Sequence, residues 1–462
     1  MYISRRAFLW GATAAGATLC GAAGREDRSP RLRIGVLSDS HVAADPATAE
    51  PLRRIFADFS EKCVDIVVHA GDICHVGDFD ELELVVDAWR SAFRDGCNAD
   101  GKRVTPFFVF GNHDYHKASF QKGNPGRPAK TIVADKDAAW RILTGAKFTG
   151  EVFAAEVKGY TFVGAHWGHE REVSDYFAAH PIADEGKPVF YVQHPHPKGT
   201  CFGVWATGIP DANGELMRHR NLFVVSGHSH ISCADDSGLW QGGFVSMGAG
   251  SARLPGPGRR ADYENGNPAP SQWTKGEFKH MPCVSGGKAW QASVVTVYAD
   301  RLTIDRYDYL NREPLGEPWD VAFPFVHDTG NPYVVARAAR PPEFAAGATV
   351  LVERKRGRRR PDDVEEDQVW VKTSAARGDG AHARAVSYIF AAIDAETGLR
   401  IAEKRVLQDW IACSEDRASC RPAWCAFAFS ELPKGRPLRF SAVPLNAAGH
   451  AGRAIESKEF VV

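Results

Sequence analysis

Five short motifs contain side chains of the kinds that bind metal ions. In chain order they are Asp39-x-His41, Gly71-Asp72, Gly111-Asn112-His113-Asp114, His194 and Gly227-His228-Ser229-His230. Carboxylate, imidazole and amide-oxygen ligands together suit two hard-to-borderline cations such as Mn, Fe or Zn. A carboxylate shared by two such ions keeps them about 3.5–4 Å apart, which is the spacing that clamps the attacking and leaving oxygens of a phosphoryl group. The motifs therefore predict a binuclear metal centre that hydrolyses phosphate esters.

Each motif lies just beyond a short apolar run that is typical of a buried strand. Stretches whose apolar residues recur at helical spacing lie between several of these runs. Continuous apolar runs are typical of strands covered on both faces. In α/β sheets, binding sites form at the carboxyl ends of the strands, so motifs far apart in the chain converge on one rim. The predicted strands cover residues 34–37, 65–68, 106–110, 160–163, 189–192 and 222–225, and the predicted helices cover residues 49–63 and 79–93.

Changes in composition and hydrophobic pattern divide the chain into three parts. Residues 1–29 read as an export signal and linker, residues 30–325 as an α/β catalytic domain, and residues 326–462 as a β-sandwich of short strands between turn signals. Near its end, the third part loosely resembles a fibronectin type III module. Within the second part, residues 254–281 are rich in Gly, Pro and Asn and are expected to form a long loop beside the site.

In this order the motifs resemble those of the calcineurin-like metallophosphoesterase superfamily, over residues 32–305. The resemblance implies a four-layer α/β/β/α sandwich for the catalytic domain. It also implies that His113 is the catalytic histidine, that Asp72 bridges the two metals, and that Asp114 supports the ligands. The implied ligands of the first metal are Asp39, His41 and His230, and those that complete the second are Asn112, His194 and His228.

Several histidines leave alternatives open. His75 stands where Ser/Thr protein phosphatases have Asp and purple acid phosphatases have a metal-binding Tyr, so neither subgroup is favoured; it is either a pocket residue or a solvent-facing one. His194 directly follows an apolar run and is preferred as the ligand over His196. His166 and His169 also follow a strand, and they either line the pocket or serve the structure.

The N-terminus resembles a twin-arginine export signal. Ser4-Arg5-Arg6-Ala7-Phe8-Leu9 precedes an uncharged Ala/Gly-rich stretch that is short and interrupted for a membrane span. An exported protein in the periplasm or at the cell surface is therefore expected, with no transmembrane segment after signal removal. Lipoprotein anchoring at Cys20 is a weaker alternative, because Leu19 occupies a position where such signals carry a small residue.

The charge balance argues against a polyanionic partner. Lys and Arg number 56 and Asp and Glu number 57, so stable nucleic-acid binding is not expected. One basic run, residues 354–360, is followed by acidic residues, and a solvated hairpin whose two halves neutralise each other is preferred over a polyanion-binding patch. In an oxidising compartment, Cys413, Cys420 and Cys425 are candidates for disulfide pairing.

Together these features predict an exported phosphoesterase that hydrolyses a mono- or diester by attack of a metal-bridging hydroxide, with His113 assisting. The expected substrate is a phosphate ester of a small molecule, a nucleotide or a lipid. A second hypothesis from another class is a non-catalytic surface protein that binds a glycan or a partner on the same scaffold. Metal content discriminates the two, because a binding-only protein is expected to hold substoichiometric metal.

Overall fold

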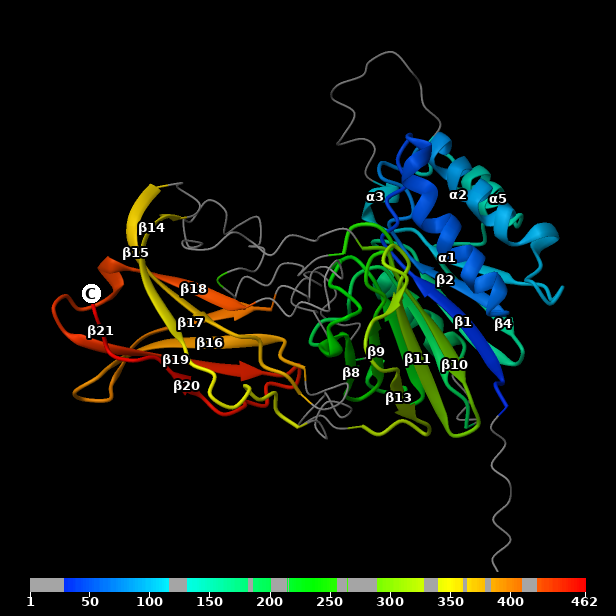
Figure 1. Cartoon of the computed structure of the whole chain (residues 1–462). Coiled ribbons are helices and arrows are strands. Elements are labelled where there is room, and N and C mark those ends of the chain that lie inside the picture. Colours follow the sequence, from blue (N-terminus) through cyan, green and yellow to red (C-terminus); the bar gives the residue numbers. More distant parts are fainter. Residues whose placement is uncertain are drawn as a thin grey trace, which may run out of the picture.

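The computed structural model describes two structured parts that follow each other along the chain (Figure 1). The described residues are 29–115, 131–181, 186–200, 214, 216–255, 264, 289–327, 340–359, 364–378, 384–408 and 422–462. The first part is a mixed α/β fold, and the second is rich in β-sheet, as predicted. Within the described residues, no helix combines the length and apolarity needed to cross a membrane.

The first sheet of the α/β part holds three of the five metal motifs. Its strand order is β12-β11-β10-β1-β2-β3, with β13 paired to β11. Strands β1, β2 and β3 are parallel, whereas β10 and β11 form an antiparallel hairpin beside β1. The bounds are β1 Leu32–Leu37, β2 Ile66–Ala70, β3 Thr105–Val109, β10 Gln291–Val297, β11 Arg301–Asp308, β12 Glu313–Pro314 and β13 Trp319–Ala322.

The second sheet holds the other two motifs. Its order is β4-β5-β6-β7-β9-β8, and β5, β6, β7 and β9 are parallel neighbours. Both sheets therefore present several carboxyl strand ends along one edge. The bounds are β4 Val152–Val157, β5 Tyr160–Ala165, β6 Val189–Gln193, β7 Leu222–Ser226, β8 Leu239–Gln241 and β9 Val245–Gly248.

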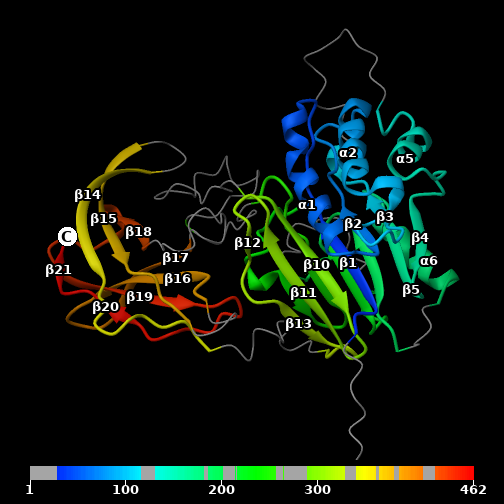
Figure 2. The ribbon, with the colours of Figure 1, turned by 45° about the vertical axis from the view of Figure 1, so that its right-hand side comes forward.

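Helices cover the outer faces of both sheets (Figure 2). Helices α1 (Glu50–Glu61), α2 (Phe79–Ala92) and α5 (Lys136–Thr144) share an apolar core with the first sheet, and α6 (Val173–Ala179) packs on the second. The inner faces of the two sheets share a further core that contains Val68, Phe190 and Val225. Helix α1 forms because its apolar residues recur at helical spacing, and all of them are fully buried: Leu52, Ile55, Phe56 and Phe59.

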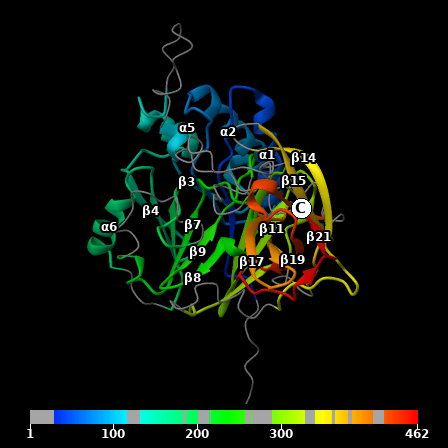
Figure 3. The same ribbon diagram turned by 90° about the vertical axis from the view of Figure 1, so that its left-hand side faces the viewer.

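The carboxy-terminal part consists of two antiparallel sheets that enclose one apolar core (Figure 3). Their orders are β14-β15-β18 and β17-β16-β19-β20, with β21 paired to β19. The predicted basic run begins in β14, opposite the acidic start of β15, and Arg356 bonds Glu365 at 3.4 Å across the pair. The bounds are β14 Leu351–Arg359, β15 Val364–Thr373, β16 Ser387–Asp394, β17 Arg400–Leu407, β18 Ala423–Ala428, β19 Pro437–Leu445, β20 Ile455–Glu456 and β21 Phe460–Val461.

Some predictions concern residues outside the described ones. The export signal, most of the loop at 254–281, and Cys413 and Cys420 all belong to this group. Cys425 is buried and free in the structure. The sequence prediction did not include β4, β8, β9, β15 or β17. Strands β8 and β9 have three and four residues, β15 and β17 carry many polar residues, and β4 is a partly exposed edge strand without a clear period.

Candidate metal centre

All five motifs meet at the adjoining carboxyl ends of the two sheets. Asp39 and His41 follow β1, Asp72 follows β2, and Asn112 with His113 opens helix α3 (Asn112–Tyr115) directly after β3. From the second sheet, His194 follows β6, and His228 and His230 follow β7. Each sequence-predicted ligand is therefore part of one site, and the side chains gather in two overlapping clusters.

The first cluster holds Asp39, His41, Asp72 and His230. His230 Nε2 lies 3.1 Å from Asp39 Oδ1 and 3.0 Å from His41 Nε2. His41 Nε2 is in turn 3.6 Å from Asp72 Oδ2. Asp39, His41 and Asp72 are buried, so this set of nitrogen and oxygen atoms converges on one point with little access to water.

The second cluster shares Asp72 with the first. His194 Nε2 lies 3.2 Å from Asp72 Oδ2, 3.1 Å from Asn112 Oδ1 and 3.2 Å from His228 Nδ1. One oxygen atom of Asp72 thus approaches a histidine of each cluster. This is the position that a bridging carboxylate needs in a binuclear centre.

The histidine orientations fit metal ligation. His194 Nδ1–H donates to the carbonyl of Ala70 at 2.7 Å, and His230 Nδ1–H donates to the carbonyl of Leu254 at 2.9 Å. In each ring the other nitrogen, Nε2, then faces the cluster, where it can hold a proton or bind a metal ion. Lone pairs and carboxylate oxygens packed this closely repel one another unless a cation lies among them.

The electrostatics of the buried groups point the same way. Burial opposes ionisation of Asp39 and Asp72, yet the neighbouring histidines hold the pKa of both carboxyls well below the usual range. Burial also opposes protonation of His194, but the Asp72 carboxylate outweighs it and raises the pKa of His194 to about 10. The site therefore favours positive charge, and its carboxylate, imidazole and amide-oxygen donors suit divalent metal ions.

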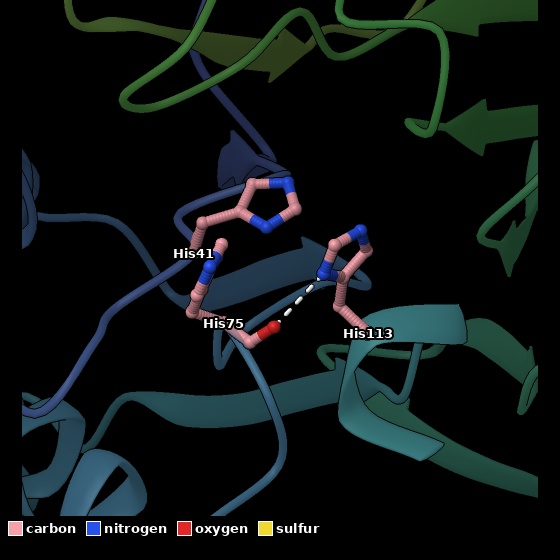
Figure 4. A group of neighbouring side chains, drawn as sticks. All are labelled: His41, His75 and His113. Carbon is pink, nitrogen blue, oxygen red and sulfur yellow. Dashed lines mark hydrogen bonds between the residues drawn. The ribbon is translucent and has the colours of Figure 1, made fainter. Parts of the chain in front are cut away.

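His113 lies at the edge of the first cluster. Its backbone N–H donates to Asp72 Oδ1 at 2.8 Å, and its Nδ1–H donates to the carbonyl of His75 at 2.8 Å (Figure 4). The His113 ring stands edge-on to His41, with ring centroids 4.6 Å apart. The ring is thus fixed beside the metal ligands, with its Nδ1 occupied by the hydrogen bond to His75.

His75 is both exposed and next to the site. Its ring centroid lies 5.7 Å from that of His113 and 6.0 Å from that of His41 (Figure 4). Its backbone N–H donates to the carbonyl of Val42 at 2.9 Å. Both alternatives that the sequence left open therefore apply, because His75 faces solvent and also lines the rim of the centre.

Asp114 supports the site through backbone amides. Its carboxylate accepts hydrogen bonds from Cys74 N at 2.8 Å, Gly111 N at 2.8 Å and Ile73 N at 3.2 Å. These amides belong to the segments that carry Asp72 and Asn112. The residue is fully buried and ties two ligand-bearing segments together.

The remaining histidines of the sequence prediction have structural partners. His196 Nε2 bonds Ser229 Oγ at 2.8 Å. His166 is stacked on Phe110, Phe148 and Phe153, and its Nδ1 accepts from Phe110 N at 2.9 Å. His169 Nδ1 bonds Glu172 at 2.6 Å. The preference for His194 over His196 agrees with this geometry, and His166 belongs to an aromatic core.

Sequence reasoning missed three contributors to the site. Trp167 packs against His228 and His194 with centroid distances of 5.2 and 5.8 Å. Ser251 Oγ donates to the carbonyl of Asp39 at 2.9 Å, and Arg253 Nη1 donates to the carbonyl of His41. All three lie beyond the carboxyl ends of β5 and β9, so the strand-end rule that located the ligands also applies to them.

The backbone at the site is unusual. Left-handed φ angles occur at five predicted ligands, Asp39, His41, Asp72, His228 and His230, with values from 43° to 64°. Two glycines allow close approach, because a β-carbon at Gly111 would overlap Asp72 Oδ1 and one at Gly227 would overlap Ser38 Oγ and Asp39 Oδ2. Strained φ angles cluster at functional sites, where surrounding contacts maintain them.

Comparison with known proteins agrees with this geometry. The family model described as calcineurin-like phosphoesterase matches residues 32–232. A comparison with curated proteins gives no match.

This chain is similar to several solved structures. A dimetal phosphatase from Danio rerio is 13% identical, covers 64% of this chain and 100% of its own, and has a TM-score of 0.33. A purple acid phosphatase from yellow lupin seeds is 12% identical, covers 64% and 55%, and has a TM-score of 0.38. A Streptococcus pneumoniae protein described as a predicted phosphoesterase is 14% identical, covers 63% and 97%, and has a TM-score of 0.25.

Scores this low carry no argument about substrate, so the assignment depends on the family match and on the clusters. The matched residues contain all seven predicted ligands and His113. Residues 32–232 thus form a calcineurin-like phosphoesterase domain, and the protein is a metal-dependent phosphoesterase.

Proposed function

We propose that the protein hydrolyses a phosphate mono- or diester outside the cytoplasm, using two metal ions and His113. The observation that carries this proposal is the position of Asp72. Its Oδ2 lies 3.6 Å from His41 in one cluster and 3.2 Å from His194 in the other, while its Oδ1 accepts the backbone N–H of His113. One carboxylate thus links both candidate metal positions to the candidate catalytic residue.

The two clusters define which residues would hold each ion. Asp39, His41, Asp72 and His230 suit one, and Asp72, Asn112, His194 and His228 suit the other. Bound cations would polarise the phosphoryl oxygens and lower the pKa of water at the site. The residues supply the rest: the carbonyls of Ala70 and Leu254 fix two of the rings, and Asp114 fixes two of the segments.

His113 is proposed to act on the phosphate or on the leaving oxygen. Its Nδ1–H is committed to the carbonyl of His75, so only Nε2 can reach a substrate. A histidine held in one tautomer by a backbone carbonyl can accept or deliver a proton at the other nitrogen without reorienting. We therefore assign to Nε2 the hydrogen bond that steadies the phosphate or protonates the departing oxygen.

The substrate is proposed to be a small-molecule, nucleotide or lipid phosphate ester. Trp167 supplies an apolar wall on the His228 side, and Arg253 supplies a permanent positive charge near His75. A mixed apolar and cationic rim suits an ester whose phosphate carries an organic group. We propose export because the N-terminus resembles a twin-arginine signal. We also propose the four-layer α/β/β/α order and the carboxy-terminal β-sandwich, and the apolar cores shared between the sheets support both.

The test is a panel of chromogenic phosphate mono- and diesters, with Mn, Fe, Zn and Ca supplied separately to the metal-free protein. We expect hydrolysis of at least one ester with at least one metal, and loss of activity in Asp72→Asn because both ions lose their shared ligand. His113→Ala is expected to bind metal like the wild type and to turn over at least about 100-fold more slowly. The matched control is His169→Ala, whose ring bonds Glu172 instead of the clusters.

Inactivity of the wild type on every ester and metal would contradict the proposal and favour the binding-protein hypothesis. Near-normal turnover in Asp72→Asn would refute the bridging role. Loss of metal in His113→Ala would show that His113 is a ligand instead of a catalytic residue.

A further inference from the structure

The segment that follows the last metal motif is a buried loop. Residues 231–236 come directly after His230, and all of them are buried. Cys233 N–H donates to Gln291 Oε1 at 2.9 Å, and the carbonyl of Cys233 accepts from Arg306 Nη1 at 2.8 Å. The backbone that carries His228 and His230 is therefore held from its carboxyl side by side chains of the first sheet.

Asp236 is the centre of this network. Its Oδ1 accepts from Arg306 Nη1 and from Trp319 Nε1, both at 3.0 Å, and its Oδ2 accepts from Arg384 Nη2 at 3.0 Å. Arg306 also lies over the Trp319 ring at 4.0 Å. A buried carboxylate is stable only when its oxygens are paired, and here two guanidinium groups share it.

Arg384 differs from the other partners because it belongs to the carboxy-terminal part of the chain. It immediately precedes β16, whereas Asp236 lies between β7 and β8 of the second sheet. Arg384 Nη2 donates to the carbonyl of Ala234 at 2.7 Å as well as to Asp236. Gly316 leaves room for the guanidinium, since a β-carbon there would lie 3.1 Å from Arg384 Nη1 and Nη2.

We propose that Arg384 is a positioning residue through which the carboxy-terminal part holds the histidine loop of the metal centre. The loop needs such a tether because His228 and His230 both have left-handed φ angles, which cost energy unless neighbouring contacts maintain them. Ala234 lies only four residues after His230, so release of its carbonyl loosens the backbone next to the ligands. The inference rests on the proposed metal binding at this site, but not on the identity of the substrate.

The experiment compares full-length wild type, Arg384→Ala and Arg384→Lys, with Arg400→Ala as the matched control. Arg400 is an exposed arginine of the same part that pairs with Glu403. Zn²⁺ affinity is measured by chelator competition, and hydrogen exchange is followed in peptides that cover residues 227–238 and in peptides from β16 and β19. Ester hydrolysis is then assayed with limiting and with excess metal.

We expect Arg384→Ala to weaken Zn²⁺ binding by about ten-fold, the lower end for residues that orient ligands, and to speed exchange in residues 227–238. Exchange in β16 and β19 is expected to stay as in the wild type, and excess metal is expected to restore most of the lost activity. Arg384→Lys keeps the charge but not the forked set of donors, so its Zn²⁺ affinity and loop exchange should lie between those of the wild type and Arg384→Ala.

Wild-type Zn²⁺ affinity and loop exchange in folded Arg384→Ala would overturn the inference. If Arg384→Ala does not fold, the same result in Arg384→Lys would overturn it. An activity loss that excess metal cannot restore, with exchange raised throughout the carboxy-terminal part, would show a purely structural role and would also overturn it. If no variant hydrolyses any ester while Zn²⁺ affinity still depends on Arg384, the proposed function fails and the inference stands.

Discussion

Asp114 offers the sharpest test of how the metal centre is built. Its Oδ2 accepts the amides of Ile73 and Gly111, and its Oδ1 accepts the amide of Cys74. Substitution by Asn keeps the shape but leaves one acceptor oxygen where the carboxylate had two. If that oxygen takes the Oδ2 position, the new NH2 group faces the N–H of Cys74, and two buried donors confront each other.

The cost follows from this count of hydrogen bonds. A buried donor without an acceptor costs about 1–3 kcal/mol, and the variant creates two of them, so the expected loss of stability is about 2–6 kcal/mol. Burial, together with the nearby Asp72 charge, raises the pKa of Asp114 to about 7, while its amide donors favour the ionised form. The comparison therefore belongs at pH 8, where the wild-type carboxylate is ionised and both of its oxygens act as acceptors.

The assay is thermal unfolding of the metal-free proteins at pH 8, followed by measurement of metal affinity. At about 2–4 °C per kcal/mol, a loss of 4 kcal/mol lowers the Tm by about 8–16 °C. Metal affinity should fall as well, because the amides lie on the segments of Asp72 and Asn112. Asp100→Asn is the control, since Asp100 is exposed and pairs only with groups near it. A Tm within about 1 °C of wild type, with unchanged metal affinity, would refute the clamp.

Two further predictions concern residues near the centre. Burial lowers the pKa of His166 to about 3, so the unfolded chain takes up a proton below about pH 6.5 that the folded chain does not, and stability falls from pH 6.5 toward 3 by up to about 1.4 kcal/mol per pH unit. His166→Phe should bind metal normally and lose about 1–2 kcal/mol of stability at pH 7, because the Phe110 amide becomes unpaired. The stability difference between the variant and the wild type should narrow as the pH falls; an equal loss of Tm in both proteins on acidification would contradict this. Gly227→Ala should reduce soluble yield or metal content, because its β-carbon overlaps Ser38 and Asp39; a fully loaded, stable variant would disprove the close approach.

The sequence was informative wherever a polar motif follows a strongly apolar run. Asp39, Asp72 and His194 each follow strands whose residues are nearly all buried, and such strands are visible as continuous apolar stretches. The strand-end rule then predicts convergence without any knowledge of distances. The ligand motifs were predictable because their strands were.

The same rule could not identify residues that follow strands without a clear sequence pattern. Ser251 and Arg253 follow β9, which has four residues and ends in a glycine-rich stretch, so neither period nor length marks it. Trp167 was overlooked because an aromatic residue beside two histidines carries no metal-binding signature of its own. Arg384 lies in the other part of the chain, and no local pattern indicates that its guanidinium meets Asp236.

Backbone strain connects these hidden residues to function. A left-handed φ is uncommon outside glycine, and Asp and His tolerate it better than most residues, yet five occur at one centre. Contacts from several directions hold these turns: Asp39 through the hydroxyl of Ser251, His41 through Arg253, and the segment after His230 through Arg306 and Arg384. Because the tethers come from several elements, the ligand geometry depends on the packing of the whole fold. Affinity for metal should consequently respond to substitutions far from the ions, and Arg384 is the most distant of these along the chain.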